Sequence, residues 1–164
     1  MLRPLSIALF YLVAVGPQPA SSQQESRSTE PVMISAKIGG KSYESAAQGS
    51  CRHTPTAAIY GVPAALWMVA LTGSEAAGIT SLNLTLWKPK NGSPQQFSVS
   101  LSTKSSSHRM DVGGRGEQVG SGKASIVGRG AGGRIEVSGQ DDSHKSIELV
   151  VNCPAFTGIE AEGG

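Results

Sequence analysis

The feature that most constrains the fold of this chain is a repeated alternation of apolar and polar residues. Apolar residues stand at positions 34, 36 and 38, with Ser35 and Lys37 between them. Successive side chains of a strand point to opposite faces, so this pattern is typical of strands with one buried and one solvated face. We therefore expect antiparallel sheets. The alternation recurs in three later segments, at 82–87, 97–102 and 146–153.

Turn signals between these segments predict which strands are neighbours. Gly39 and Gly40 predict a hairpin between the first segment and a short strand at 41–46. The Pro, Asn, Gly and Ser residues of 89–94 predict a second hairpin, between the second and third alternating segments. About eight short strands indicate an all-β fold, an antiparallel β-sandwich or a partly open barrel. Weaker alternation predicts the remaining strands, at 108–112, 123–127 and 134–138.

The segment at 64–72 is apolar at both parities. Leu66 and Met68 share one side, and Trp67 and Val69 share the other. This pattern predicts a central strand buried on both faces. The alternative is a short helix, because Pro63 followed by two alanines can also begin one.

The first 22 residues are typical of a secretory signal peptide. Arg3 precedes an apolar segment at 5–15, and the residues of 16–22 are mainly Gly, Pro, Ala and Ser. Eleven apolar residues are well short of the roughly 20 that a membrane-spanning helix needs. We expect cleavage before Gln23 and a secreted, periplasmic or cell-envelope location, the alternative being an uncleaved anchor.

The rest of the chain suits a single domain. About 140 residues are enough for one core and too few for two. The residues at 23–31 have no apolar member that could pack before Val32, and they predict a flexible lead-in. We expect a β-domain at 32–155 and a disordered tail at 156–164.

The charge of the mature chain argues against general attraction to nucleic acid or to an anionic membrane surface. Removing residues 1–22 removes Arg3 and no acidic residue, so 14 basic residues become 13 against 12 acidic ones. The resulting net charge of +1 gives no long-range pull towards phosphates.

The two cysteines, Cys51 and Cys153, are expected to form a disulfide. Both lie in the part predicted to be exported, where thiols tend to be oxidised. Two separate buried thiols are the alternative. A cysteine-based zinc site is not expected, because the chain has no close pair of cysteines.

The glycine-rich stretch at 128–133 matches the spacing G-x-G-x-x-G but does not predict a nucleotide site. A phosphate-binding turn of this type opens a helix, whereas the segment that follows here alternates like a strand. We therefore expect no cofactor.

No catalytic or metal-binding residues are predicted. His53, His108 and His144 each lie in or beside a polar turn, which we interpret as a solvated position. Neither a G-x-S-x-G elbow nor an H-E-x-x-H pair is present. Asp141, Asp142 and His144 supply too few ligands for a designed cation site by themselves.

The candidate binding surface is centred on Trp87. If Leu84 and Leu86 point inward, Trp87 points outward with Asn83 and Thr85. A large aromatic side chain on a polar sheet face is a common contact for sugar rings or protein partners. The alternative is that the loop after Trp87 folds over its ring.

Five short features follow one another along the chain, at 38–41, Cys51, 120–125, 135–139 and 145–154. Together they resemble the mycobacterial LpqH-type lipoprotein antigen family. The resemblance covers roughly residues 33–154 and implies a cell-envelope or secreted β-domain with bridged cysteines, no established enzymatic activity and a role at the host surface. The lipidated cysteine of the family is absent, so membrane attachment is not implied.

The sequence therefore predicts an exported, non-enzymatic binding, structural or surface-antigen-like module. Its partner is expected to be a protein or a glycan at the cell surface. The alternative is a small secreted hydrolase whose polar residues converge only in three dimensions.

Overall fold

The structure is a computed structural model that describes residues 30–59, 61–73, 78–114 and 116–159. The predicted signal peptide and most of the predicted lead-in lie outside these residues. Every regular element within the described residues is a β-strand. This part of the chain has no helix long and apolar enough to cross a membrane.

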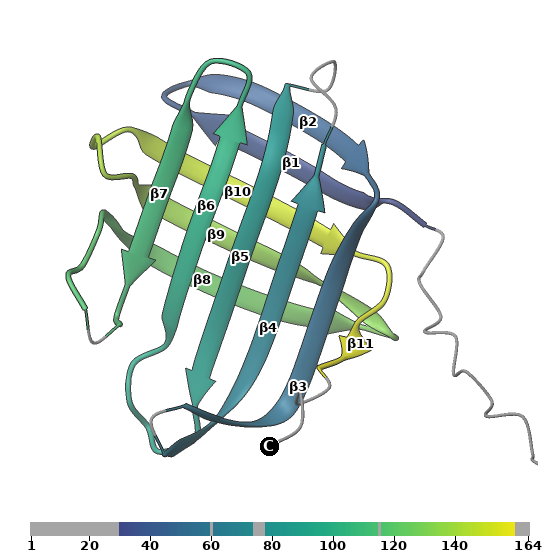
Figure 1. Cartoon of the computed structure of the whole chain (residues 1–164), viewed down its shortest axis with the longest axis vertical. Helices are drawn as coiled ribbons and strands as arrows, with labels where there is room; N and C mark the ends of the chain where they lie inside the picture. The colour runs from purple at the N-terminus through teal and green to yellow at the C-terminus, as the bar shows by residue number, and fades with distance from the viewer. Residues whose placement is uncertain (1–29, 60, 74–77, 115, 160–164) are drawn as a thin grey trace, which may run out of the picture.

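The strands form two sheets that pack face to face as a β-sandwich. In Figure 1 the six-stranded sheet lies in front, and its strands cross those of the five-stranded sheet behind it at a steep angle. All pairings are antiparallel except that of β11 with β3. The five-stranded sheet has the order β2 (Lys41–Ala47), β1 (Val32–Ile38), β10 (Ser146–Cys153), β9 (Gly132–Gln140) and β8 (Ser121–Arg129). The six-stranded sheet has the order β11 (Thr157–Gly158), β3 (Gly49–Ile59), β4 (Val62–Thr72), β5 (Ile79–Pro89), β6 (Gln96–Thr103) and β7 (Ser107–Val112).

Both predicted hairpins are present, and the predicted all-β sandwich is confirmed. β1 pairs with β2 across Gly39 and Gly40, whose φ angles of 55° and 88° favour glycine. β5 pairs with β6 in a register that places Leu84 opposite Val99 and Leu86 opposite Phe97. The alternation therefore puts these apolar side chains on one face of the sheet.

The core lies between the two sheets and consists of the inward-facing positions of the alternating strands. Burying this apolar surface is the main favourable contribution to folding, at roughly 25 cal/mol per Å² removed from water. The most deeply buried side chains include Ile79, Leu82, Leu84, Leu86, Leu101, Met110, Ile135, Ile147, Leu149 and Val151.

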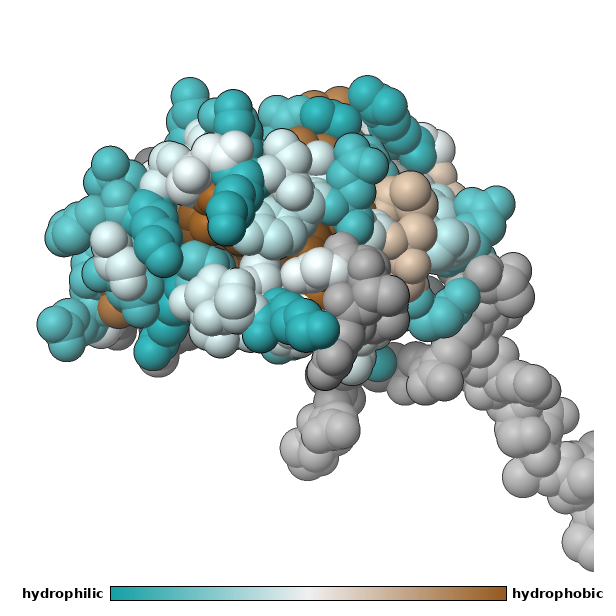
Figure 2. Space-filling view, turned by 90° about the horizontal axis from the view of Figure 1, so that it is seen from above, coloured by the Kyte–Doolittle hydropathy of each residue, from teal (hydrophilic) through white to brown (hydrophobic). Residues whose placement is uncertain are grey.

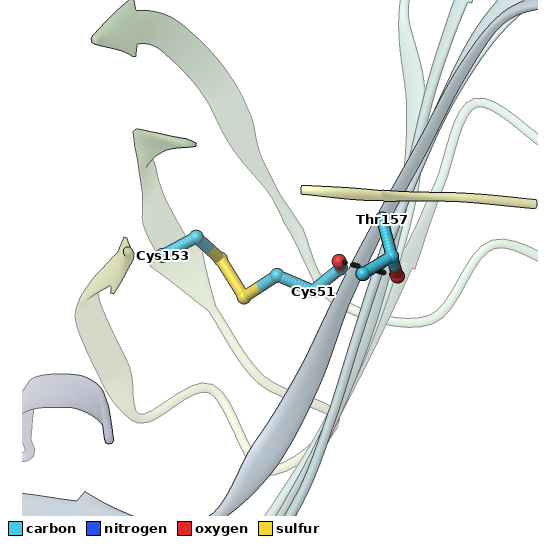
Figure 3. Close-up of a disulfide and its surroundings, with 3 residues drawn as sticks. All are labelled: Cys51, Cys153 and Thr157. Carbon is cyan, nitrogen blue, oxygen red and sulfur yellow. Dashed lines mark hydrogen bonds between the residues drawn. A yellow bond between two sulfur atoms is a disulfide. The ribbon is translucent and has the colours of Figure 1, made fainter. Parts of the chain in front are cut away.

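The predicted disulfide is present and joins the two layers. Cys51 lies on β3 of the six-stranded sheet and Cys153 on β10 of the five-stranded sheet, with their Cα atoms 6.0 Å apart. Both are buried in the core. Figure 3 shows the bond crossing between the sheets, beside the hydrogen bond that Thr157 donates to the Cys51 carbonyl.

The sequence prediction missed β3, one of the long strands. This segment has few apolar residues, so alternation does not reveal it. It also contains Pro55, which cannot donate to a ladder. The structure places Pro55 in the register shift between Thr54 and Ala57 against β4, where a strand tolerates proline.

The segment at 64–72 is a strand, as predicted, but it is not buried on both faces. Val69 and Leu71 point into the core, whereas Met68 is 40% exposed and Ala70 is exposed on the outer face. Only one side of the six-stranded sheet is covered by the other sheet. Apolar residues at odd and even positions of β4 therefore predicted more burial than this strand has.

The glycine-rich stretch at 128–133 ends β8, turns and begins β9. A Cβ on Gly132 would lie 2.1 Å from the Cys153 carbonyl oxygen, and one on Gly133 would lie 2.9 Å from the ring of Phe156. These glycines therefore allow close packing, and the strand that follows them offers no helix N-terminus for a phosphate.

The domain extends beyond the predicted boundary at residue 155. Phe156 packs against the core and its amide donates to the Ala131 carbonyl, while Thr157 and Gly158 pair with β3 as β11. The predicted tail at 156–164 thus begins too early. Hydrogen bonding and packing of Phe156 hold this segment to the domain, and residues 160–164 lie outside the described residues.

Candidate functional site

Trp87 lies on the outer face of the six-stranded sheet, as the alternation of β5 predicts. Leu84 and Leu86 are buried, whereas Thr85 and Trp87 are half-buried on the opposite face. β5 is a central strand of the front sheet in Figure 1, so Trp87 has a neighbouring strand on each side. Its register partners are Leu66 on β4 and Gln96 on β6.

Trp87 lines a small cavity on this face, here called the Trp87 groove. The cavity has a volume of about 260 Å³. It combines an aromatic ring with hydroxyl, amide and carboxylate groups, which provide both donors and acceptors of hydrogen bonds. Its lining residues are Thr85, Trp87, Gln96, Phe97, Ser98, Asp111, Gly114 and Gly116.

The structure brings together two of the three predicted surface residues and separates the third. Thr85 and Trp87 both line the Trp87 groove. Asn83 is exposed two residues earlier on β5 and lines another cavity, of about 570 Å³, together with Cys51 and Ala70. The candidate surface is therefore shorter along β5 than the sequence predicted, and it extends instead across β6 to Asp111 on β7.

A third cavity, of about 490 Å³, contains an aromatic cluster that sequence reasoning did not single out. The rings of His53 and Trp67 are stacked, with centroids 4.5 Å apart and planes 7° apart, and Phe156 meets His53 edge-on. His53 Nδ1 lies 2.9 Å from the Leu66 carbonyl oxygen and donates to it. His53 and Trp67 are register partners on β3 and β4. Because the sequence did not predict β3, it could not predict that His53 lies beside Trp67.

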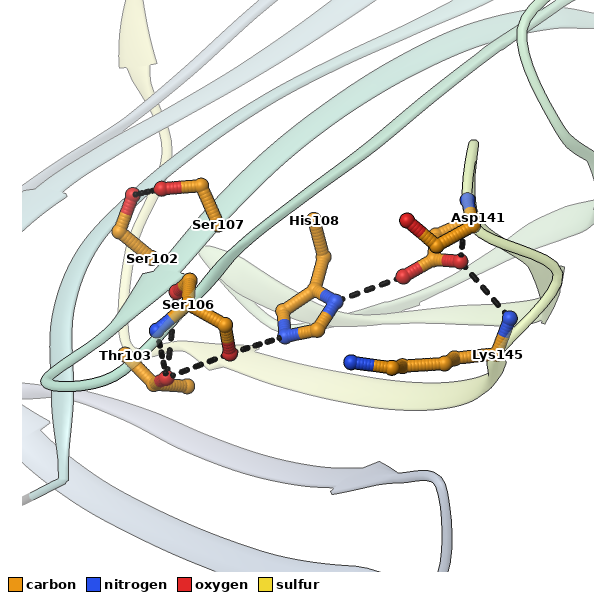
Figure 4. A network of polar contacts seen from close by, with 8 residues as sticks. Ser102, Thr103, Ser106, Ser107, His108, Asp141 and Lys145 are labelled. Carbon is orange, nitrogen blue, oxygen red and sulfur yellow. Dashed lines mark hydrogen bonds and ion pairs between the residues drawn. The ribbon is translucent and has the colours of Figure 1, made fainter.

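The structure corrects the interpretation of His108 as a solvated side chain. His108 is only 3% exposed, because it points inward from β7 with the same parity as buried Met110. Its Nδ1 lies 2.6 Å from Asp141 Oδ2, and its Nε2 lies 2.8 Å from Ser106 Oγ. Figure 4 shows the three side chains in a row, with the imidazole between the hydroxyl and the carboxylate.

The carboxylate of Asp141 is held in a fixed orientation and is ionised at neutral pH. It is 0% exposed, and its Oδ1 accepts hydrogen bonds from the backbone amides of Ser143 and Lys145. Burial by itself would raise the pKa of Asp141. The hydrogen bonds from His108, Lys145 and Ser143, together with the charge of His108, outweigh burial and lower the pKa below its ordinary value of 3.8.

The two other histidines have different surroundings. His53 is half-buried in the aromatic cluster, whereas His144 is exposed in the turn after Asp141, with a φ angle of 60°. Within the described ranges, no group of three or more His, Cys, Asp and Glu residues could hold a metal ion.

The signal for the His108 contact was present in the sequence but was weak. His108 and Met110 share a parity in a predicted strand, which indicates an inward side chain. Asp141 lies 33 residues later, in the connection between β9 and β10 of the other sheet. No short sequence motif indicates that these two side chains meet.

Comparisons with protein-family models, curated proteins and solved structures give no match to this chain.

Proposed function

We propose that this protein is an exported binding module of the cell envelope or of the secreted fraction, and that it binds saccharide through the Trp87 groove. The observation that carries the proposal is the position of Trp87: an indole ring half-buried among hydroxyl, amide and carboxylate groups on an open sheet face. The resemblance to LpqH-type antigens also implies a cell-envelope or secreted domain.

The chemistry of the groove favours a saccharide over a protein partner. A sugar ring has an apolar face that can stack on an indole, and hydroxyls that can bond to Thr85, Ser98, Gln96 and Asp111. The volume of about 260 Å³ lies below the roughly 300 to 1,000 Å³ of sites for drug-sized ligands, so it suits one ring or a short segment.

Binding variants test this proposal. The oxidised protein is applied to an array of neutral and acidic oligosaccharides, and affinities for the bound ones are measured by titration calorimetry. Trp87→Ala should weaken binding by about 10- to 100-fold, since truncation of a buried aromatic anchor typically costs more than 1 kcal/mol. Trp87→Phe keeps a ring and should lose less.

Met68→Ala is the matched control. Met68 lies on the same outer face and is a register partner of Thr85, but it does not line the groove. Its truncation should leave saccharide affinity unchanged. Equal saccharide affinity of the wild type and of folded Trp87→Ala would show that saccharide does not bind in the Trp87 groove. Binding through Trp87 to a protein partner alone, with no saccharide bound, would show that the groove is a protein-binding site.

Export has a separate test. Mass spectrometry of the secreted protein under non-reducing conditions should show a chain that begins at Gln23 and carries no free thiol. The disulfide and the charge pattern of the first 22 residues support this expectation. A chain that retains residues 1–22 would instead support a membrane anchor.

A further inference from the structure

We propose that Ser106 is an activated nucleophile that accepts acyl groups from esters with a good leaving group, with His108 as its general base. This activity goes beyond the proposed saccharide binding and uses a different place in the fold. Ser106 lies in the turn after β6, whereas Gln96 in the Trp87 groove begins β6 at the opposite end of the sheet (Figure 1).

The geometry is that of a nucleophile, a base and an orienting carboxylate in one chain of hydrogen bonds. Asp141 is ionised and can only accept, so His108 Nδ1 carries the hydrogen of their 2.6 Å contact. When the imidazole is neutral, its Nε2 then has a free lone pair aimed at the Ser106 hydroxyl, 2.8 Å away. Nucleophilic serines are recognised by this arrangement rather than by their order in the sequence.

The burial of the three groups runs in the order that such chemistry needs. Asp141 is inaccessible and His108 is nearly so, whereas Ser106 is only partly buried. The serine is therefore the most accessible member of the row. The upper end of the sandwich, which carries the turn between β6 and β7, has a mainly hydrophilic surface with a few small hydrophobic areas (Figure 2).

The turn also limits which substrates can react. The Ser106 amide already donates to Thr103 Oγ1, at 3.2 Å, so this amide is not available to an oxyanion. Loss of one oxyanion donor costs about 10²- to 10³-fold in rate in a serine hydrolase. We therefore restrict the activity to activated esters, such as aryl esters of short acids, and exclude peptides.

The reaction would proceed in two balanced steps. Ser106 Oγ bonds to the carbonyl carbon as its proton moves to His108 Nε2, the bond from that carbon to the alcohol oxygen breaks, and the imidazole returns the proton to the leaving alcohol. The oxygen of a water molecule then bonds to the acyl carbon as a proton of that water moves to His108 Nε2. The bond from the acyl carbon to Ser106 Oγ breaks, the imidazole returns the proton to Ser106 Oγ, and the carboxylic acid leaves. Asp141 is a positioning residue that fixes the imidazole tautomer.

A fluorophosphonate probe tests the nucleophile directly. In this reaction an oxygen–phosphorus bond forms at the serine, the phosphorus–fluorine bond breaks, and fluoride leaves with the serine proton. The oxidised full chain is labelled, digested with trypsin and fragmented. Cleavage after Lys104 and Arg109 yields a peptide that contains Ser105, Ser106, Ser107 and His108, so the adduct can be assigned among three consecutive serines.

The neighbouring serines provide matched controls. Ser105→Ala and Ser107→Ala should label like the wild type, whereas Ser106→Ala should form no adduct. His108→Asn should label about 10²- to 10⁴-fold more slowly, the range that general base catalysis contributes. Heat-unfolded wild type should not label, which separates the folded site from ordinary serine reactivity even if His108→Asn fails to fold.

Asp141→Asn tests the positioning role by aryl acetate turnover. Its kcat should fall while KM stays unchanged, because the carboxylate acts on the imidazole and not on the ester. The absence of an adduct on folded wild type, or equal adducts on all three serines, would overturn the proposal. Either result would leave saccharide binding at Trp87 unaffected.

Discussion

Cys51 and Cys153 lie on opposite sheets of the sandwich, and their disulfide is a covalent connection between the two layers. They are separated by 102 positions in the sequence. The bridge therefore closes a loop that contains most of the domain. It also stands beside the segment at 156–158 that extends the six-stranded sheet past Cys153.

Removal of the disulfide should destabilise the domain strongly. The double variant Cys51→Ala, Cys153→Ala should lose about 2 to 5 kcal/mol of unfolding free energy, because a long closed loop restricts the unfolded chain. Denaturant unfolding of the oxidised wild type and the variant would measure this difference. Equal midpoints would show that the sheets hold together without the bridge.

The pair of His108 and Asp141 should make stability depend on acidity. The folded pKa of Asp141 is lowered, so the contribution of Asp141 to stability is complete above its ordinary pKa of 3.8 and is lost as the pH falls through the folded pKa. Asp141→Asn should cost about 1 to 3 kcal/mol at pH 7. The gap between wild type and variant in thermal unfolding should narrow below about pH 4. A gap that stays constant down to pH 2 would contradict the assignment.

Two glycines that flank the turn between β8 and β9, Gly128 near the end of β8 and Gly132 at the start of β9, should respond differently to alanine. Gly132→Ala should destabilise by about 1 to 3 kcal/mol, since its Cβ would collide with the Cys153 carbonyl oxygen. Gly128→Ala has no atom within 4 Å of its Cβ and should be neutral or slightly stabilising. Urea unfolding of both variants would measure the effects. Similar costs would show that flexibility, rather than close approach, explains the glycines.

The one-sided burial of β4 predicts unequal costs for neighbouring truncations. Leu71→Ala should lose about 2 to 5 kcal/mol because it leaves a cavity in the core. Met68→Ala, on the outer face, should stay within about 0.5 kcal/mol of the wild type. Chemical unfolding compares them directly, and a large loss for Met68→Ala would mean that the outer face is covered.

Most of the fold could be predicted because each alternating strand reports its own buried face. The segments around Ile34, Leu84, Val99 and Leu149 have apolar side chains at every second position, and all of these side chains are buried. β3 could not be found in this way. β3 is held by its backbone ladder with β4, by the disulfide of Cys51 and by the stacking of His53 on Trp67. The ladder involves no side chains, and one cysteine and one histidine do not make an alternating apolar pattern.

The candidate sites were less predictable than the fold. The outward position of Trp87 followed from the parity of β5, but the groove also needs Asp111 from β7 and the turn that contains Gly114. The contact between His108 and Asp141 depends on how the two sheets pack, because His108 lies on β7 of one sheet and Asp141 lies in the connection between β9 and β10 of the other. Local sequence patterns do not indicate that His108 and Asp141 lie within hydrogen-bond distance of each other.

The central claim, that saccharide binds in the Trp87 groove, is tested most directly by NMR titration of the protein labelled with nitrogen-15. The chain has two tryptophans, Trp67 and Trp87, and each contributes one indole N–H signal, which a Trp67→Phe variant assigns. Addition of a saccharide selected from the array should shift the Trp87 indole signal progressively and leave the Trp67 signal in place. A titration in which Trp67 moves and Trp87 does not would contradict the account.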